Sequence, residues 1–445
     1  MAVRLSLSSH FTYRRLLRFT LPTMVMMVFM SLYSIVDGVF VSNFVGKTAL
    51  AAVNLIFPVS MALCTIGFMV GTGGSAVVAR TLGEGKERLA QEYFSLLIFL
   101  TLAVGGVLSV LGVAFTPQIA LALGAEGQLL EDTVRYGRIL FAGQTAFMLQ
   151  SAFQCFFVAA ERPGLSLRIN IAAGLTNMVL DGVFIAGFQW GLAGAATATV
   201  LGEMVGSVIP LVYFARRNGS LLRLRRPGRF YGGMVGQACL NGSSEMVSNL
   251  SASLVNILYN FQLMALVGED GVAAYGVIMY VNFVFVGTFL GFALGSAPLV
   301  SYHYGAGNRE ELHNLFAMSL RLMAGAGIVL TLAAEGASAL LVGAFASYDP
   351  ELYQLTLRGF RLYSLAFLCM GMNLWGSAFF TALNNGAVSA AIAFLRALVF
   401  QVAAVLLLPL ALDLDGVWLA VAAAEVPALG VTACFLAAKR KKYGY

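Results

Sequence analysis

The chain has 445 residues, of which 59% are hydrophobic and only 11% are charged. A soluble protein of this length would carry about a quarter charged residues, so the composition excludes an ordinary soluble globular protein. The net charge of +6 would fit a nucleic-acid-binding protein, but the basic residues gather in short segments between long apolar runs, which argues against nucleic acid and predicts a polytopic helical membrane protein.

The apolar runs are long enough to cross a hydrocarbon core of about 30 Å as helices, and we expect twelve of them. Those of the first half lie near residues 17–42, 48–79, 93–118, 133–160, 165–189 and 192–215. Those of the second half lie near residues 232–264, 271–302, 315–343, 355–382, 388–411 and 416–438. The first run looks like a signal peptide, but no small-residue cleavage site interrupts it, so we interpret it as the first membrane helix.

Most of the 27 Lys and Arg residues fall on one side of this predicted topology. They lie in the N-terminal segment, in the stretch "RRNGSLLRLRRPGR" and in the C-terminal tail "KRKK". Because cytoplasmic loops are enriched in Lys and Arg, the asymmetry predicts that both termini are cytoplasmic and that the number of spans is even. We expect a multi-pass protein of a bacterial inner (plasma) membrane, and a monomer, since each chain would contain its own cavity.

A shift of 222 residues aligns the chain with itself without a gap from about residue 45 to residue 203. The shift pairs Gly73 with Gly295 and Glu203 with Glu425. The sequence therefore predicts two homologous six-helix bundles in an all-α polytopic membrane protein. The expected division is a first bundle, a cytoplasmic basic linker and a second bundle, at residues 1–215, 216–230 and 231–445. Parallel repeats of this kind commonly enclose a cavity and transport by alternating access.

Two aspartates interrupt apolar runs in nearly the same local sequence, Asp37 in "YSIVDGVFV" and Asp181 in "NMVLDGVFI". A carboxyl at the centre of a membrane helix costs about 2.5–3.5 kcal/mol on insertion scales, so such residues are usually functional. The alternative is a carboxyl that only ties neighbouring helices together. Tyr33 and Asn177 lie one helical turn before the two acids and offer hydrogen bonds. The second half has Ala403 where the first has Asp181, so we expect ion handling in the N-terminal half.

Three further acids and one base lie deep in the predicted helices. Glu203 and Glu425 occupy equivalent repeat positions, and their simplest interpretation is a structural hydrogen bond inherited by duplication. Glu245, in the polar stretch "NGSSEMVSN", either lines the cavity and attracts a cationic substrate or serves packing. Arg396 is expected to extend toward the membrane surface or to meet a carboxylate of a neighbouring helix.

Four segments carry a resemblance to a known family: "LPTMVMMVFMSLYSIVDGVFVSNFVGKTALAAVNL", "GTGGSAVVARTLGEGKERLA", "NMVLDGVFIAGFQWGLAGAATATV" and "GSAPLVSYHYGAGNREEL". On these segments the chain resembles multidrug and toxic compound extrusion (MATE) transporters, in particular the DinF-like and neighbouring bacterial branches. The resemblance implies export of bulky, often cationic organic compounds in exchange for H⁺ or Na⁺, by a V-shaped pair of bundles. It also implies a cation-coupling network in the first bundle that consists of Asp37, Asp181, Tyr33, Asn177, Tyr136, Thr199 and Gln154. Where sodium is the coupling ion, the two aspartates would hold the Na⁺.

Flexible thioethers and aromatic rings suit a pocket that accepts many flat hydrophobic molecules. We expect small-molecule substrates to contact Glu245, Met27, Met30 and Phe153. An enzyme is not expected, because the predicted helices contain neither a zinc-protease motif nor a serine–histidine pair, and we expect no cofactor beyond the coupling ion. One alternative remains, a lipid-linked oligosaccharide flippase of the same superfamily, which would favour a strongly cationic cavity.

Overall fold

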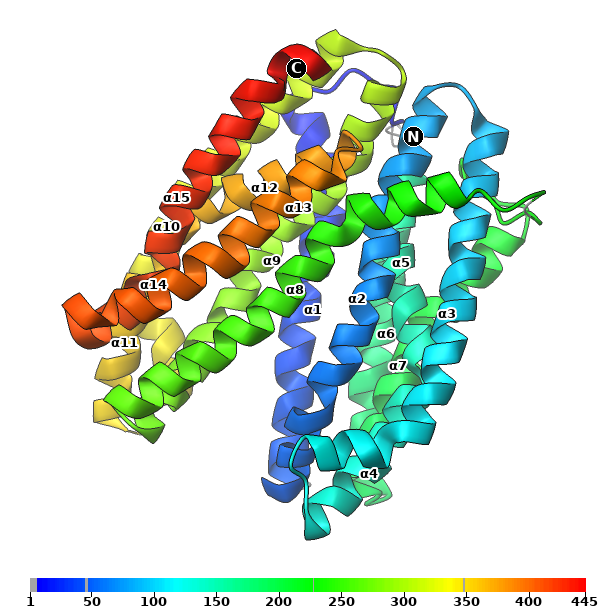
Figure 1. The fold of residues 1–445 in the computed structure, drawn as a ribbon. Helices are drawn as coiled ribbons and strands as arrows, with labels where there is room; N and C mark the ends of the chain where they lie inside the picture. The colour runs from blue at the N-terminus through cyan, green and yellow to red at the C-terminus, as the bar shows by residue number, and fades with distance from the viewer. Residues whose placement is uncertain (1–5, 45–46, 227, 347–348) are drawn as a thin grey trace.

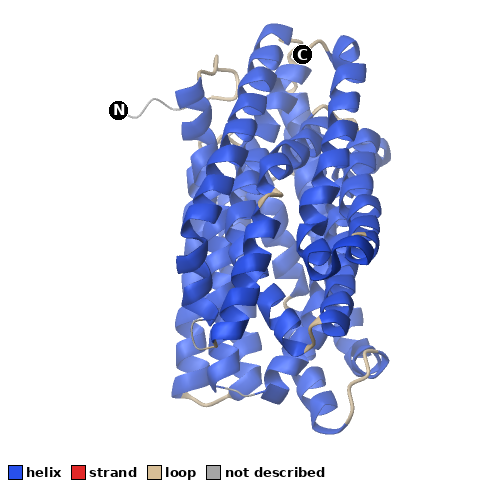
Figure 2. Ribbon diagram, turned by 90° about the vertical axis from the view of Figure 1, so that its left-hand side faces the viewer, coloured by secondary structure: helices blue, strands red, loops and turns tan. Residues whose placement is uncertain are grey.

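The computed structural model describes the backbone of residues 6–44, 47–226, 228–346 and 349–445, and the side chains of these residues except 34–50 and 344–346. The described chain is built of helices joined by short loops and contains no strand (Figure 2). Two helical bundles lie side by side, and both termini lie at the same end of the molecule (Figure 1). The fold class expected from the sequence is therefore confirmed.

The helices of the first bundle follow the chain from Tyr13 to Ala215. They are α1 (Tyr13–Phe44), α2 (Lys47–Gly83), α3 (Glu87–Ala122), α4 (Gly127–Ala142), α5 (Gln144–Ala159), α6 (Pro163–Asp181), the π-helix η1 (Gly182–Gly187) and α7 (Gly191–Ala215). The second bundle consists of α8 (Gly232–Leu266), α9 (Glu269–Gly305), α10 (Arg309–Ala346), α11 (Pro350–Ser364), α12 (Phe367–Ala382), α13 (Gly386–Phe394), the π-helix η2 (Leu395–Phe400), α14 (Gln401–Leu407) and α15 (Pro409–Tyr443).

Four of the twelve expected helices are interrupted, which corrects the prediction. The helix expected at 165–189 is α6 followed by the π-helix η1. The helix expected at 133–160 is two helices that meet at Gly143, and the helix expected at 355–382 is α11 and α12, bent by 49°. The helix expected at 388–411 is α13, η2 and α14, and α15, which begins at Pro409, is kinked at Asp413 (φ 47°), between the two expected helices. The same spans are affected in both bundles, since the fourth is broken and the fifth contains a π-helix. The element order thus repeats as the 222-residue alignment predicts.

Nine of the described helices are long and apolar enough to cross a membrane, or ten when α11 and α12 count as one bent span. α4 and α5 fall short by length, at 16 residues each, and α8 falls short by its composition. α4 carries two acids and two arginines in 16 residues, and α8 contains the polar stretch "NGSSEMVSN". Polar groups in a spanning helix are tolerated where they face protein or a water-filled cavity. The polarity of α8 therefore indicates that its polar face lies toward protein or a water-filled cavity.

The two bundles contact each other at the end where the termini lie. There α2 packs against α8 and α9, and α1 packs against α9 (Figure 1). Glycines allow this close approach, because a Cβ on them would collide with the backbone of the facing helix, as small residues do in membrane interfaces. The pairs are Gly73 against Ala238, Gly242 against Met69, Gly83 against Tyr302 and Gly305 against Arg80. Toward the other end the bundles diverge (Figure 1).

The segment before α1, residues 6–12, connects the two bundles at this same end. The backbone N–H of Leu7 donates to Oε1 of Glu161 (2.6 Å), in the turn between α5 and α6. The N–H of Phe11 donates to Oε1 of Glu311 (2.9 Å) in α10, and Asn314 donates to the Phe11 carbonyl (2.9 Å). The N-terminal segment is thus held by a carboxylate of each bundle.

Candidate functional site

Asp181 is the last residue of α6 and is fully buried, at 0% exposure. The chain continues directly into the π-helix η1. A π-helix is a wider turn that is rare in proteins and often found at functional sites. The structure therefore places this carboxyl inside the first bundle, at a break in regular helical hydrogen bonding.

Asn177 and Thr199 come together across the packed pair α6 and α7. The Asn177 side-chain nitrogen donates to Oγ1 of Thr199 (3.5 Å), which itself donates to the Ala195 carbonyl (3.1 Å). Gly202 permits the approach, because a Cβ there would lie 3.0 Å from the Cβ of Asn177 and 2.9 Å from the Ala173 carbonyl oxygen. The amide, the hydroxyl and the Asp181 carboxyl thus share one region of the α6–α7 interface.

The two expected tyrosines approach this region from α1 and α4. Tyr33 of α1 packs against α6 at Gly174, one turn before Asn177. Tyr136 of α4 is 3% exposed and belongs to a buried cluster with Ile185 of η1. Asp37 belongs to the part of α1 whose side chains are not described, so its role stays a prediction.

Buried amides extend the polar region toward α5. The side-chain nitrogen of Gln154 donates to Oδ1 of Asn170 (3.0 Å), and that of Gln150 donates to the same atom (3.2 Å). Gln154 also contacts the sulfur of Met30 (3.5 Å). We call Gln150, Gln154 and Asn170 the amide cluster. Gln150 and Asn170 were not among the residues expected from the sequence, although each is a polar amide inside an apolar run, the same pattern that identified Asn177.

Two oxygens of this region are fully enclosed and accept no hydrogen bond from the described residues: Oδ1 of Asn177 and Oε1 of Gln154. Buried polar atoms are normally hydrogen-bonded, so such atoms require an explanation, such as an ion or a water molecule. Amide, hydroxyl and carboxyl oxygens are the hard ligands that an alkali cation prefers, and a carboxyl accepts a proton equally well. The residues present therefore fit either a sodium ion or a proton.

The four expected substrate contacts occupy different environments. Glu245 of α8 is half-buried and lies within electrostatic range of Arg396 in the second bundle and of Cys155 in the first, which places it between the bundles. Met27 packs against Gly287 of α9 at the bundle interface.

The other two expected contacts belong to the first bundle. Met30 is half-buried beside Gln154. Phe153 is 1% exposed and stacks on Phe214, with ring centroids 5.8 Å apart, inside the apolar core. Its role as a substrate contact stays a prediction, and the packing observed for it is that of a core residue.

The second bundle contains a buried ion pair. Arg396 in η2 binds both carboxylate oxygens of Glu425 in α15, with Nε–Oε1 and Nε–Oε2 distances of 2.9 and 3.0 Å and an Nη2–Oε1 distance of 2.8 Å. Asn373 of α12 donates to Oε2 of Glu425 (2.6 Å) and accepts from Thr432 (3.0 Å). Of the two outcomes expected for Arg396, the structure shows the pairing with a neighbouring carboxylate.

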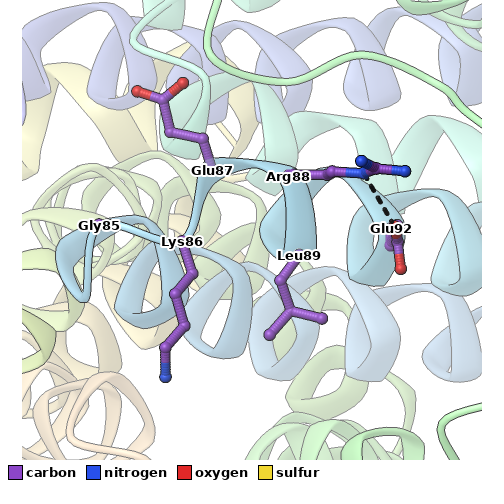
Figure 3. Close-up of a pocket in the computed structure, with 6 residues that line it drawn as sticks. All are labelled: Gly85, Lys86, Glu87, Arg88, Leu89 and Glu92. Atoms are coloured by element: carbon purple, nitrogen blue, oxygen red, sulfur yellow. Dashed lines mark ion pairs between the residues drawn. The ribbon is translucent and has the colours of Figure 1, made fainter.

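A surface pocket lies at the turn between α2 and α3 (Figure 3). The side chains of Lys86 and Glu87 point away from one another, and Arg88 forms an ion pair with Glu92, Nε to Oε1 3.6 Å. The pocket lining is charged and solvent-exposed. Its side chains do not converge on a point where a ligand could bind, so the buried region of the first bundle remains the candidate site.

Comparisons with known proteins agree with this architecture. The family model MatE matches residues 22–183 and 246–406, one stretch in each bundle. Two curated relatives are named multidrug export protein MepA. The protein of Staphylococcus haemolyticus is 24% identical over 66% of this chain and 64% of its own length, and that of Staphylococcus aureus strain MSSA476 is 23% identical over 81% of both chains.

Solved structures show the same fold. A multidrug resistance MATE transporter in an outward-facing conformation superposes with a TM-score of 0.92, at 21% identity, over 98% of this chain and 97% of its own. A transporter of the same superfamily from Pyrococcus furiosus, described as having a binding pocket of reversed polarity, superposes with a TM-score of 0.90 at 21% identity, over 98% of both chains.

Proposed function

The chain belongs to the MatE family, whose members are membrane transporters and not enzymes, and we propose that it is a secondary active antiporter that exports bulky, often cationic organic compounds. The energy would come from H⁺ or Na⁺ entering the cell. The observation that carries the proposal is the fully buried Asp181 at the end of α6, in one region with Asn177 and Thr199.

The arrangement of the bundles supports alternating access. Their close contacts lie at the end that holds both termini, where α2 packs on α8 and α9. With cytoplasmic termini, as the basic segments predict, this state is closed to the cytoplasm and opens outward. The halves 1–215 and 231–445 would rock as units, and residues 216–230 would connect them.

Coupling follows from differential binding in the two states. An ion shifts a conformational equilibrium only by the difference in its affinity for the two conformations. We propose that the ion binds at Asp37 and Asp181 when the site is open to the outside, with Asn177, Thr199, Tyr33, Tyr136 and Gln154 as neutral partners. Its binding would release the substrate outward, and Glu245, between the bundles, would attract the positive charge of the substrate.

The flippase alternative loses its main support in the second bundle. A pyrophosphate-linked lipid would favour free basic groups inside the membrane. Arg396, the basic residue expected deepest in the helices, is already bound to both oxygens of Glu425. We therefore favour small-molecule export, by a monomer in the plasma membrane of a bacterium.

Dye efflux tests the proposal. Cells expressing the wild-type chain would be loaded with ethidium, and efflux would be followed with the proton gradient collapsed and, separately, with sodium removed. We expect energised efflux that one of the two treatments abolishes, which identifies the coupling ion. Asp37→Asn is expected to reduce efflux to the level of cells without the transporter, because its amide cannot exchange charge with the ion.

The matched control is Asp132→Asn, at a surface carboxylate of α4 that accepts a hydrogen bond from Gln128 (3.2 Å). It is expected to leave efflux unchanged. Full efflux by well-expressed Asp37→Asn protein would refute the coupling role of this acid, and wild-type efflux that survives both treatments would refute ion-coupled antiport.

A further inference from the structure

Glu203 is a buried acid that the proposed ion site does not use. It stands at the midpoint of α7, with twelve residues of the helix on either side, and is 7% exposed. Its Oε2 is fully enclosed and has no hydrogen-bond partner among the described residues. A carboxyl in the middle of a membrane helix is costly when it is charged and unpaired, so its presence requires an explanation.

The duplicated half of the molecule shows how such a carboxyl is held when its role is structural. Glu425, at the equivalent repeat position, is fully buried and bound by Arg396 and Asn373. Glu203 has neither partner. The residue 222 positions before Arg396 is Gly174, and the residue 222 positions before Asn373 is Ser151. The structural hydrogen bond expected at both positions is therefore present at Glu425, whereas Oε2 of Glu203 has none among the described residues.

No basic side chain is available to Glu203 from the described parts of the helices around it. α5 and η1 carry no charged residue, and in α6 the charged residues are the exposed Arg168 and the carboxyl of Asp181. The arginines of α4 are exposed, and those of α1 lie in its first two turns. The other titratable groups in the described parts of these helices are Cys64, Cys155, Tyr33, Tyr136 and Asp181, the exposed Glu131 and half-buried Asp132 of α4, and Tyr13, Arg80 and Tyr213 near the ends of α1, α2 and α7.

The position of Glu203 connects the ion site with the amide cluster. Thr199 lies one turn before it, on the same face of α7 and about 6 Å along the axis. Gly206 lies one turn after it, and a Cβ there would collide with the side chain of Gln150. Cys64 of α2, which contacts Oγ of Ser151 (3.3 Å), is within electrostatic range of Glu203. The polar groups therefore continue along α7 past the proposed ion site.

We propose that Glu203 binds and releases one proton in each transport cycle, as a further ion-coupling group in the first bundle. This inference rests on the proposed ion-coupled export and adds a proton-binding residue to it. In the step, an aqueous proton forms an O–H bond with the carboxylate when the bundles open outward. The same bond breaks, and the proton returns to water, when the site opens inward and a cationic substrate enters.

A proton fits this position better than a metal ion. Sodium requires several hard oxygen ligands, and the group of α2 within electrostatic range of Glu203 is the soft sulfur of Cys64. The described residues contain no group of three or more His, Cys, Asp or Glu side chains that could hold a metal ion. Protonation needs only the carboxyl itself.

Proton release on substrate binding tests the inference. The purified full-length chain in detergent, in weakly buffered solution with a pH indicator, would be titrated with tetraphenylphosphonium across the neutral pH range. Glu203→Gln is expected to release about one proton fewer per bound cation than the wild type, because one exchangeable carboxyl is gone. Glu203→Asp retains the carboxyl and is expected to restore the release.

The matched control is the double variant Arg396→Gln with Glu425→Gln, which removes the equivalent acid together with its counter-ion. It is expected to release as many protons as the wild type. Gel filtration establishes that each variant is folded before titration. Equal proton release by Glu203→Gln and the wild type, or binding by the wild type with no release at all, would overturn the assignment of Glu203.

Failure of the proposed function is detected separately. Wild-type proteoliposomes that take up tetraphenylphosphonium in response to neither a proton nor a sodium gradient would overturn ion-coupled export itself. Gradient-driven uptake combined with unchanged proton release by Glu203→Gln would overturn only the role of Glu203.

Discussion

The two bundles share one element order but differ in where their interiors are polar. Where the first has Asp181, Asn177 and Thr199, the second has the apolar residues Ala403, Val399 and Val421 at the positions shifted by 222. Both bundles retain one glutamate, Glu203 in the first and Glu425 in the second, but the two differ in their partners. In the second bundle Arg396 neutralises Glu425, whereas in the first Glu203 has no basic partner among the described residues.

This difference indicates a division of labour between the copies. A buried carboxyl that is already paired with an arginine cannot gain or lose charge without a large penalty, because the remaining charge would be left uncompensated. An unpaired carboxyl can exchange its proton whenever water reaches it. Under the proposed coupling, the first bundle would retain the groups that change charge, while the acid of the second stays paired with Arg396.

The largest effect is expected from Asp181→Asn. Without ion exchange at this position the two conformations are no longer biased by the gradient, so gradient-driven efflux should fall roughly 100-fold or more, to the leak level. The measurement is ethidium efflux at matched expression. Ala403→Asn, at the equivalent position of the second bundle, should retain efflux within about twofold. An equal loss in both variants would contradict the assignment of ion exchange to the first bundle.

Breaking the ion pair of the second bundle should mainly affect stability. Glu425→Gln leaves the Arg396 guanidinium buried without its counter-ion, which is expected to cost about 3–5 kcal/mol. The melting temperature in detergent should fall by several degrees. Glu203→Gln should leave it unchanged or raise it, because no partner is lost. Similar melting temperatures for the two variants would show that their carboxyls are held in the same way.

The contact between the bundles can be tested at Gly83. A leucine there would collide with the backbone of α9 at Tyr302, and overpacking of this kind costs about 1–3 kcal/mol. The bundles should separate at the end that holds the termini. Spin labels at positions 86 and 308, both exposed, would report a longer distance. Gly106→Leu, on α3 with open space around its Cβ position, should leave the distance distribution unchanged.

The smallest effect is expected at the N-terminal segment. Glu161→Ala removes the acceptor of the Leu7 N–H, a loss of about 1 kcal/mol. Trypsin should then cleave after Arg14 or Arg15 several times faster, because the segment detaches more often. Glu126→Ala, at an exposed glutamate with no capping hydrogen bond, should not change the rate, and cleavage at equal rates in both would mean that Glu161 does not hold the segment.

The sequence is sufficient for the parts of the fold that depend on composition and periodicity. Apolar runs predict the spans, and the 222-residue shift predicts the two bundles. The break at Gly143 is not visible in this way, because the apolar pattern of 133–160 continues through it. A Cβ at Gly143 would lie 2.5 Å from the Val200 side chain, so the break depends on the approach of α7, a tertiary contact.

The candidate site, like the fold, is predictable from the sequence only in part. An acid in an apolar run identifies Asp181, and the resemblance to the family adds Thr199 and Tyr136. The resemblance also adds Gln154, but the other two residues of the amide cluster, Gln150 and Asn170, were not predicted, because the hydrogen bonds to Asn170 come from a different helix. The contrast between Glu203 and Glu425 also depends on a neighbour, since equal spacing in the sequence does not reveal which glutamate meets an arginine.

The N-terminal segment sets an order of events during synthesis of the chain. Leu7 leaves the ribosome early, but its acceptor Glu161 follows 154 residues later, and the acceptor of Phe11, Glu311, follows 300 residues later. Chains fold progressively as they are made. The first bundle must therefore enter the membrane with this segment only partly anchored, and the ribosome has completed α9 before the second anchor is available. Residues 7 and 11 are therefore translated long before the acceptors that hold them in place.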